Sequence, residues 1–314
     1  MKKIISILWL FLVSLFVSTP LLHADDTLLA FPGAEGFGRY ATGGRGGTIY
    51  HVTNLNDSGT GSLRDAVSSS NRIIVFDTCG VIYLSSALTF SSNLTILGQT
   101  APGEGIQVYG DRVTFSGTEN LIIRYMRFRM GKSGTSGADA AGIANGKTMI
   151  FDHLSVLWGR DECFSINWDN KGTEPTDITI QNSIIGQGLQ DHSCGGLMQT
   201  DGGVTLFRNL YIENKTRNPK VKGLNQFVNN VVYNWGSGGC YIMGGESSGT
   251  SWADIECNYF MKGPWEGSTK ALVKGNENFK YYAQGNYYDF YKDGTINGHS
   301  MTDDEYDASG SLRI

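Results

Sequence analysis

The chain has 314 residues, a net charge of −5 at pH 7 and 42 glycines. This length suffices for one or two domains. The negative charge argues against a nucleic-acid partner, since proteins that bind a phosphate backbone need surplus lysine and arginine. Charged residues make up only 18% of the chain, and its apolar runs are short, rich in β-forming residues and interrupted by Gly, Asn and Ser, so we expect an all-β protein.

The first residues have the order of a secretory signal peptide. Lys2 and Lys3 precede a long apolar run, and the small residue Ala24 stands just before Asp25. The apolar run is about five residues too short to span a bilayer well. We therefore predict a signal peptide over residues 1–24, a secreted or periplasmic location, and no membrane association after cleavage. Loss of the two lysines leaves 23 basic and 30 acidic residues, a charge of −7.

A β-rich unit recurs along most of the remaining chain. Each unit places an asparagine or histidine between two β runs, as in KTMIFDHLSV, DITIQNSII and NQFVNNVVYN. A period in the twenties predicts a solenoid, because units of this size bury their apolar face only when stacked. The aligned positions, spaced by 21 to 29 residues, are Gly98, Tyr125, His153, Asn182, Asn209, Asn230, Asn258 and Asn286.

The composition of the units indicates which solenoid they form. They are too short and too rich in Val, Ile, Thr and Gly for helical repeats, and they lack the spacing of leucine-rich repeats. We predict an all-β fold, a right-handed parallel β-helix with one coil per unit. The recurrent asparagine would form a ladder, since its amide donates and accepts hydrogen bonds between coils.

Both ends of the repeat region fit this fold. The stretch GSLRDAV, residues 61–67, predicts a short N-terminal helix that begins near Ser62 and caps the open first coil. The β-helix is expected over residues 25–290. Residues 291–314 are polar and lose the pattern, so they are expected to be a tail or the stub of a missing continuation.

The cysteines do not form a metal-binding motif. An odd number in an exported protein leaves at least one free thiol, and no spacing resembles a zinc knuckle. We expect buried structural cysteines with at most one disulfide. They are Cys79, Cys163, Cys194, Cys240 and Cys257.

Stacking converts sequence spacing into proximity. Asp161, His192 and Arg217 lie eight to ten residues after their ladder positions. Because coils stack about 4.8 Å apart, the three should line up on successive coils, with Arg217 roughly 10 Å from Asp161 and His192 between them. An acid, an imidazole and a guanidinium on one wall would suit a long anionic ligand.

Three carboxylates should converge at the acidic end of this wall. Glu162 adjoins Asp161, and Asp139 lies one coil earlier. Without a lysine nearby they would repel one another unless a cation lay among them. Hard oxygen ligands on flexible loops favour calcium. The alternative is a solvated acidic turn.

The stretch NKTRNPKVKG places four cations around one proline. Lys215, Arg217, Lys220 and Lys222 are close enough to repel one another and to lower one another's pKa. With calcium they would form a positive field that holds a polyanion and makes Arg217 easier to deprotonate. The alternative is a solvated turn.

Three motifs on this repeat resemble the pectate lyases of polysaccharide lyase family 1. FPGAEGFGRYATGGRGG followed by VTNLNDSGTGSLRDAV resembles the entry segment of that family. DAAGI and MIFDHLSVLWGRDE are similar to its calcium-side strands, and RNPKVKG is similar to its Arg-x-Pro-x-x-Arg motif. The resemblance extends from about Phe31 to Asn286.

The resemblance implies roles for the basic residues. Arg217 matches the catalytic arginine of the family, its proposed proton acceptor. Lys222 stands where a second, substrate-binding arginine is usual; it keeps the charge but loses the bidentate fork. His192 lies near a position often held by a substrate-binding lysine, and Lys220 of the same basic stretch is also expected to bind substrate.

The resemblance also implies a calcium site. Asp139 and Asp161 match calcium ligands. Ser165 stands where the family often has a further aspartate, and Glu162 is expected to compensate as a ligand.

The implied activity is that of a secreted, calcium-dependent pectate lyase, a monomer that cleaves polygalacturonate by β-elimination. The C5 proton would leave, positive groups would stabilise an enolate-like state, and the C4–oxygen bond would break to give unsaturated oligogalacturonates. Either Arg217 takes the proton, or it stabilises the enolate while hydroxide or His192 does so.

Three other functions remain open. A pectin lyase would act on methylated polymer without calcium. A polygalacturonase-like hydrolase would need clustered catalytic carboxylates beside the substrate. A non-catalytic β-helix would serve as an adhesin or glycan-binding scaffold, and Ser165 and His192 are the departures from the family pattern that favour it.

Several other conspicuous residues are expected to be structural. Trp158, Trp168 and Trp235 could offer faces to sugar rings, but core packing is the simpler expectation for each. His153, at a ladder position, and its neighbour Asp152 are expected to stabilise the fold.

Overall fold

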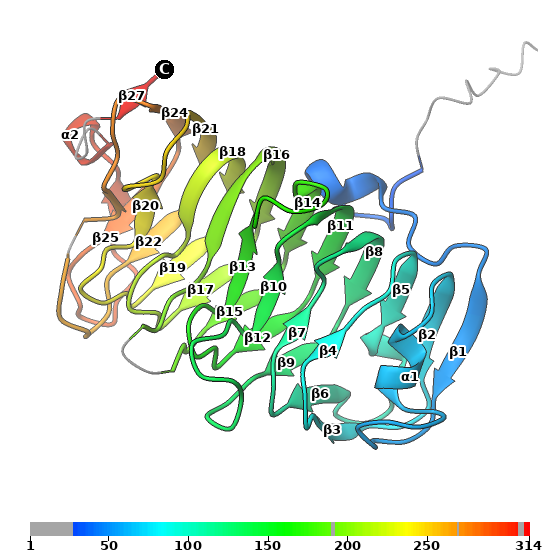
Figure 1. The fold of residues 1–314 in the computed structure, drawn as a ribbon. Helices are drawn as coiled ribbons and strands as arrows, with labels where there is room; N and C mark the ends of the chain where they lie inside the picture. The colour runs from blue at the N-terminus through cyan, green and yellow to red at the C-terminus, as the bar shows by residue number, and fades with distance from the viewer. Residues whose placement is uncertain (1–27, 190–191, 269, 307–310) are drawn as a thin grey trace, which may run out of the picture.

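The computed structural model describes residues 28–189, 192–268, 270–306 and 311–314. They form a parallel β-solenoid of about nine turns, which confirms the predicted β-helix (Figure 1). Every strand pairing in these ranges is parallel except that of β25 with β26. The expected signal peptide lies outside the described residues.

Two sheets make the walls of the solenoid. The larger sheet comprises β1 (Thr48–Val52), β2 (Arg72–Phe76), β4 (Leu88–Thr89), β5 (Leu94–Leu97), β7 (Val113–Thr114), β8 (Thr118–Arg124), β10 (Ala141–Ile143), β11 (Gly146–Asp152), β13 (Phe164–Asn167), β14 (Thr176–Gln181), β16 (Leu197–Phe207), β18 (Lys220–Val228), β20 (Tyr241–Met243), β21 (Ser251–Glu256), β23 (Leu272–Val273), β24 (Phe279–Gln284) and β27 (Leu312–Arg313). The smaller sheet comprises β3 (Gly80–Tyr83), β6 (Ile106–Tyr109), β9 (Arg127–Arg129), β12 (Ser155–Leu157), β15 (Ile184–Gly186), β17 (Leu210–Ile212), β19 (Val231–Tyr233), β22 (Tyr259–Met261), β25 (Tyr287–Asp289) and β26 (His299–Ser300).

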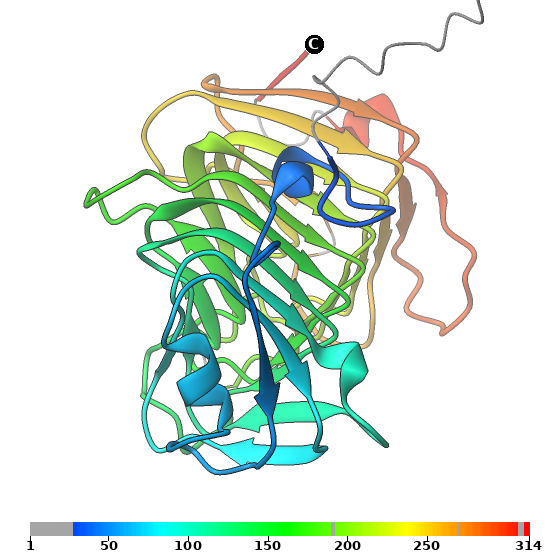
Figure 2. The ribbon, with the colours of Figure 1, turned by 90° about the vertical axis from the view of Figure 1, so that its right-hand side faces the viewer.

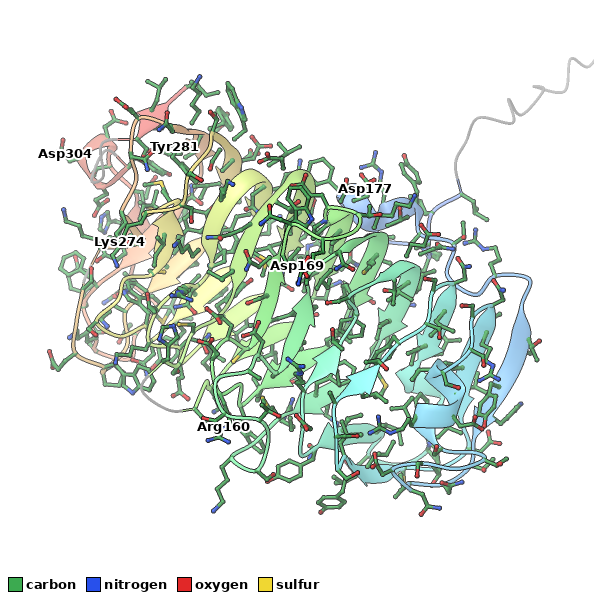
Figure 3. The ribbon with its side chains drawn as sticks, viewed as in Figure 1. Arg160, Asp169, Asp177, Lys274, Tyr281 and Asp304 are labelled. Carbon is green, nitrogen blue, oxygen red and sulfur yellow. The ribbon has the colours of Figure 1, made fainter. Side chains whose placement is uncertain are left out.

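The inward side chains of both sheets form one continuous core. Alternate strand residues point inward, so each coil adds a layer of Ile, Val, Leu and aromatic side chains. The ring of Phe151 lies 4.9 Å from that of Phe115 and 5.2 Å from that of Phe164, centroid to centroid. The core reaches the last coils, where Tyr281 is buried (Figure 3).

An asparagine ladder runs through the corner between the two sheets. The backbone N–H of Asn209 donates to Oδ1 of Asn230 at 2.9 Å, that of Asn230 to Asn258 at 2.8 Å, and that of Asn258 to Asn286 at 2.9 Å. The ladder ends at the Tyr306 hydroxyl, which accepts from the Asn286 amide at 3.1 Å. The four asparagines are fully buried, as a role in joining coils requires.

The first half of the predicted ladder is wrong by one residue. Asn182 and His153 lie in the neighbouring column, where residues adopt positive φ, and they are partly exposed. Their true ladder counterparts are Ser183, whose N–H donates to Asn209, and Leu154, whose N–H donates to Ser183. Asparagine suits both columns, because it tolerates the left-handed region and also bridges coils.

His153 and Asp152 have the structural role expected of them. Asp152 is buried and accepts from Arg124 at 2.8 Å and from Gln181 and Asn182 at 2.9 Å each. His153 Nδ1 lies 2.9 Å from the same carboxylate. Burial alone would raise the pKa of Asp152, but these hydrogen bonds outweigh it and hold the pKa below its usual value.

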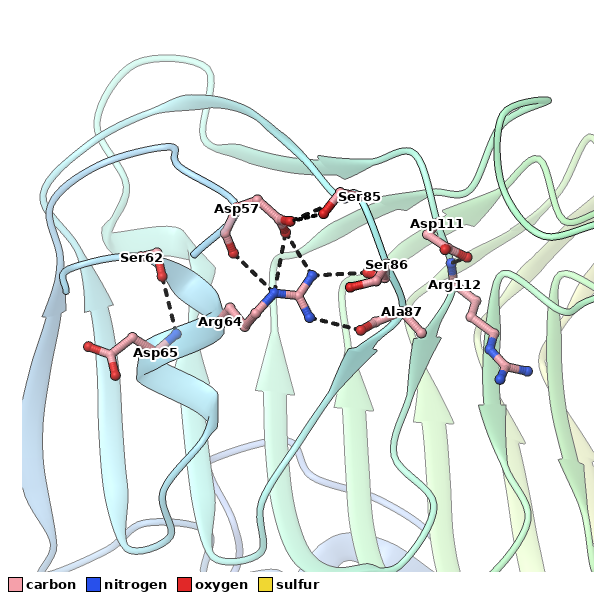
Figure 4. Close-up of polar contacts among 9 residues, drawn as sticks. All are labelled: Asp57, Ser62, Arg64, Asp65, Ser85, Ser86, Ala87, Asp111 and Arg112. Atoms are coloured by element: carbon pink, nitrogen blue, oxygen red, sulfur yellow. Dashed lines mark hydrogen bonds and ion pairs between the residues drawn. The ribbon is translucent and has the colours of Figure 1, made fainter. Parts of the chain in front are cut away.

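The N-terminal helix is present and braces the first coil. Helix α1 (Leu63–Val67) begins after Ser62, whose Oγ accepts from the Asp65 N–H at 3.2 Å (Figure 4). Arg64 pairs with Asp57 at 2.7 Å and donates to the Ala87 carbonyl at 2.8 Å. The predicted cap is therefore confirmed, and Arg64 ties it to the next coils.

The described segments before β1 and after β25 pack onto the solenoid in different ways. The 3-10 helix η1 (Phe37–Tyr40) crosses the middle coils (Figure 2), and Gly38 N–H donates to Thr179 Oγ1 at 2.9 Å. A second 3-10 helix, η2, spans Gly98–Thr100. After residue 291 the chain forms β26, the helix α2 (Asp303–Tyr306) and β27, which pairs with β24. Among the described helices none is long and apolar enough to span a bilayer.

The cysteines form no disulfide in the structure. All five are free thiols; Cys163, Cys194 and Cys240 are buried, whereas Cys79 and Cys257 are exposed. Trp235 is fully buried, as expected, whereas Trp158 and Trp168 are half-buried.

Replacement of a true ladder residue should destabilise the fold far more than replacement of its neighbour. Asn230→Ala leaves the Asn209 N–H and the Leu206 carbonyl without partners, so we expect a loss of about 3 kcal/mol in unfolding free energy. Asn229→Gly, the control, sits at φ 56° and should cost less than about 0.5 kcal/mol. Urea unfolding would show this, and equal losses would contradict the ladder assignment.

Candidate active site

The predicted site residues gather at one corner of the solenoid, where the chain passes from the smaller to the larger sheet. Asp139 precedes β10, and Asp161 and Glu162 precede β13. His192 precedes β16, and Arg217 precedes β18. Isolated parallel bridges join Glu162 to Cys194 and Cys194 to Thr216, so three successive coils stack at this corner.

The predicted alignment of Asp161, His192 and Arg217 on equivalent positions is wrong in register. The bridged residues are Glu162, Cys194 and Thr216. They lie five, eight and four residues after the ends of β12, β15 and β17, so the corner loops differ in length. The prediction counted residues from the ladder positions, and this count aligns the three side chains only if the corner loops have equal lengths. The side chains nevertheless converge.

The three predicted carboxylates form one cluster. Oxygens of Asp139, Asp161 and Glu162 all lie within 4.8 Å of one another, and the Glu162 N–H donates to Asp139 Oδ1 at 3.1 Å. Burial, with the charges of Asp139 and Asp161, raises the pKa of Glu162 to about 8. Burial also raises the pKa of Asp139. The carboxylates therefore repel one another more strongly than the neighbouring positive charge compensates.

Arg217 makes a direct ion pair with this cluster. Its Nη1 donates to Glu162 Oε1, and the Glu162 side chain is only 3% exposed. The sequence predicted that the lysines together with calcium would make Arg217 easier to deprotonate, and this stays a prediction. Burial acts to lower the pKa of Arg217, but the negative charges of Cys194 and Glu162 at high pH outweigh it and raise the pKa. The acidic cluster was expected to have no lysine nearby, and the structure places an arginine against it.

His192 belongs to the edge of the same cluster. Its Nε2 lies 3.3 Å from Asp161 Oδ1, and its side chain is 58% exposed. Glu162, His192 and Cys194 also bring ligand atoms within 4.8 Å of one another, a grouping that the sequence did not suggest. Burial raises the pKa of the Cys194 thiol to about 12, which keeps it protonated and makes it a poor metal ligand at neutral pH. The oxygen cluster is the better cation site.

Pockets lie along the outer wall on both sides of the cluster. Toward the N-terminal coils, one of about 260 Å³ is lined by Asp139, Ser165 and Asp169. Toward the C-terminal coils, one of about 470 Å³ is lined by Arg217, Lys220 and Lys274. Figure 3 shows Asp169 and Lys274 at separate points along the stack. Asp169 and Lys274 could not be found from the sequence, because neither belongs to a motif.

The two lysines predicted to bind substrate lie on one face of β18. Lys220 and Lys222 alternate with the buried Val221, and they pair in register with Leu197 and Gln199 of β16. Burial and the charge of Arg217 lower the pKa of Lys220. The basic stretch therefore forms part of the wall, and it is not a fully solvated turn.

Ionisation of Glu162 should make stability depend on pH. The raised pKa means that the folded chain keeps a proton which the unfolded chain releases near pH 4.5. Without added metal, unfolding free energy should therefore fall by about 4 kcal/mol between about pH 5 and pH 8. Glu162→Gln, which cannot ionise, should flatten this decline. An unchanged slope in Glu162→Gln would contradict the assignment, and urea unfolding at several pH values measures it.

The sequence of the chain was compared with those of known proteins. No protein-family model matches the chain. A probable pectate lyase C of Aspergillus flavus is 60% identical over 297 residues, which cover 95% of this chain and 69% of that protein. A probable pectate lyase C of Aspergillus fumigatus is 62% identical over 279 residues, which cover 89% of this chain and 65% of that protein.

Solved structures agree on the fold. A thermostable pectate lyase superposes with a TM-score of 0.60 at 17% identity, over 92% of this chain and 91% of that one. A pectate lyase of Bacillus sp. N165 in complex with trigalacturonate gives a TM-score of 0.55 at 16% identity, over 86% and 91%. With its β-helix and its two relatives near 60% identity, this chain belongs to the pectate lyase family and is a polysaccharide lyase.

Proposed function

We propose that this chain is a secreted, calcium-dependent pectate lyase that cleaves polygalacturonate by β-elimination. The observation that carries the proposal is the contact between Arg217 and Glu162 within a three-carboxylate cluster, beside a basic strand. In this proposal residues 1–24 are a signal peptide, residues 25–290 form the lyase domain, and residues 291–314 follow it.

Asp139, Asp161 and Glu162 would hold the calcium. Their fit to a divalent cation rests on charge and chemistry: three carboxylates converge, and Arg217 supplies a single full positive charge among them. Carboxylate oxygens are the ligands that calcium prefers. Bound calcium would withdraw negative charge from a substrate carboxylate and so acidify the neighbouring C–H bond.

The basic wall would hold the polymer. Lys220 and Lys222 project from the same face of β18, so they can attract successive carboxylates of a polyanion. Lys222 acts as a point charge, without the fork of an arginine. His192, at the exposed edge of the cluster, would add a further contact. The trigalacturonate bound to the related Bacillus lyase supports a galacturonate polymer as substrate.

Arg217 would act as the cation that stabilises the reaction's charged intermediate. Its ion pair with Glu162 favours the protonated guanidinium. The C5 proton passes to hydroxide or to His192, and the charge that develops on the substrate carboxylate is stabilised by Arg217. The electron pair then forms the C4–C5 double bond, the C4–oxygen bond breaks, and the departing oxygen takes a proton from water.

The lyase reaction can be followed by the ultraviolet absorbance of the new double bond. With polygalacturonate we expect absorbance to rise with calcium and to stop with chelator, because the carboxylate cluster needs its cation. A greater rise on methylated polymer despite chelator would instead support a pectin lyase. New reducing ends without absorbance would support hydrolysis, and no change would support a non-catalytic scaffold.

Arg217 and His192 can be tested by substitution. Arg217→Ala should lower kcat by about 10³-fold, because it removes a charge that acts mainly in the transition state. Arg208→Ala, which removes an exposed arginine outside the corner, should leave kcat unchanged. If His192 takes the C5 proton, His192→Ala should lower kcat by about 10²-fold. If hydroxide takes that proton instead, the rate of His192→Ala should rise with pH as the rate of the unsubstituted enzyme does. A modest change for Arg217→Ala would refute its catalytic role.

A further inference from the structure

A separate pocket of about 310 Å³ lies beside the acidic cluster on the same corner. Ser193, Lys215, Trp265 and Glu266 line it. It shares no lining residue with the pocket around Arg217. Ser193 directly follows His192, and Lys215 N–H donates to the Ser193 carbonyl at 2.7 Å. The floor of the pocket is therefore built from the same two coils as the proposed catalytic corner.

The loop that carries Trp265 is fixed in place. The Trp265 N–H donates to Asn234 Oδ1 at 2.9 Å. Gly263 and Gly267 let the loop pack closely, since an added Cβ would lie 2.5 Å from Asn234 Cβ at the first and 2.4 Å from Ser237 Cα at the second. The indole remains 39% exposed. Trp265 therefore lines the pocket with part of its surface accessible.

The Ser193 hydroxyl is the second sign of a ligand site. Ser193 is only 4% exposed, and its Oγ has no hydrogen-bond partner among the described residues. A buried hydroxyl without a partner is unfavourable, so a polar ligand that reaches it gains a hydrogen bond. Gly188 packs against this hydroxyl, because a Cβ added there would lie 2.7 Å from Ser193 Oγ.

We propose that this pocket binds one pyranose ring, with the ring face against Trp265 and a hydroxyl on Ser193 Oγ. A pyranose offers an apolar C–H face and a polar rim, which matches an aromatic wall with a few convergent polar groups. Glu266, with a side chain 97% exposed, can accept from ring hydroxyls, and Lys215 supplies a donor. The inference rests on the proposed function in one respect: the bound ring is assumed to belong to the polysaccharide that the lyase cleaves.

The ring could come from a backbone galacturonate or from a neutral side branch. The test uses the full chain with Arg217→Ala, which prevents cleavage, and two probes: trigalacturonate and a β-1,4-linked galactotriose. The indole N–H signal of Trp265, assigned by its loss in Trp265→Phe, is followed by NMR during each titration. A shift with trigalacturonate identifies a backbone ring, and a shift with galactotriose identifies a branch.

Affinity provides the second readout. Trp265→Ala should weaken binding of the responsive probe about five- to tenfold in calorimetry, the loss expected for one ring stacked on an aromatic face. Trp252→Ala is the matched control, because Trp252 is 47% exposed and lies on β21, away from the corner. Ser193→Ala should also weaken the same probe.

Two results would overturn the pyranose site: no shift of the Trp265 signal with either probe, or equal weakening by Trp252→Ala. The lyase proposal fails by a different measurement, the absence of unsaturated product from the unsubstituted enzyme. An indole shift would persist in that case, so the two failures can be told apart.

Discussion

Parallel register between neighbouring coils is the constraint on which everything else in this molecule depends. It makes residues 21 to 29 positions apart in sequence into neighbours about 4.8 Å apart. The ladder from Asn209 to Asn286 fixes that register inside the corner between the sheets. At the opposite corner the same register joins Glu162 to Cys194 and Thr216. Four loops that are separate in the sequence thereby build one charged cluster.

The three carboxylates of the cluster repel one another, and the stacked coils hold them together against this repulsion. Burial and mutual repulsion raise the pKa of Glu162 to about 8, and Arg217 offsets part of the repulsion through its ion pair. A flexible loop would separate these carboxylates, whereas backbone bonds between coils hold them together. A perturbed acid beside a guanidinium, between two wall pockets, is the arrangement from which catalytic sites are commonly built.

The sequence predicted the fold, and it predicted which residues gather at the corner, better than it predicted the register that aligns them. The period, the β-rich units and the GSLRDAV cap were enough for a β-helix, because each is a local pattern. The register failed at Asn182, since asparagine suits both the left-handed column and the ladder. The alignment of His192 with Arg217 failed because corner loops of unequal length separate the strands. Trp265 carried no signal, because its pocket arises only when loops from several coils meet.

The shared backbone of the cluster and the Trp265 pocket links the two sites mechanically. Lys215 and Arg217 lie two residues apart on one short loop, and Ser193 lies next to His192 on the loop it contacts. Movement of either loop would shift both sites, because the backbone bond from Lys215 to Ser193 joins them. A sugar ring seated on Trp265 would therefore also restrain the loop that holds Arg217. In this fold, close packing of corner loops places the proposed pyranose pocket directly beside the loop that carries the proposed catalytic cation.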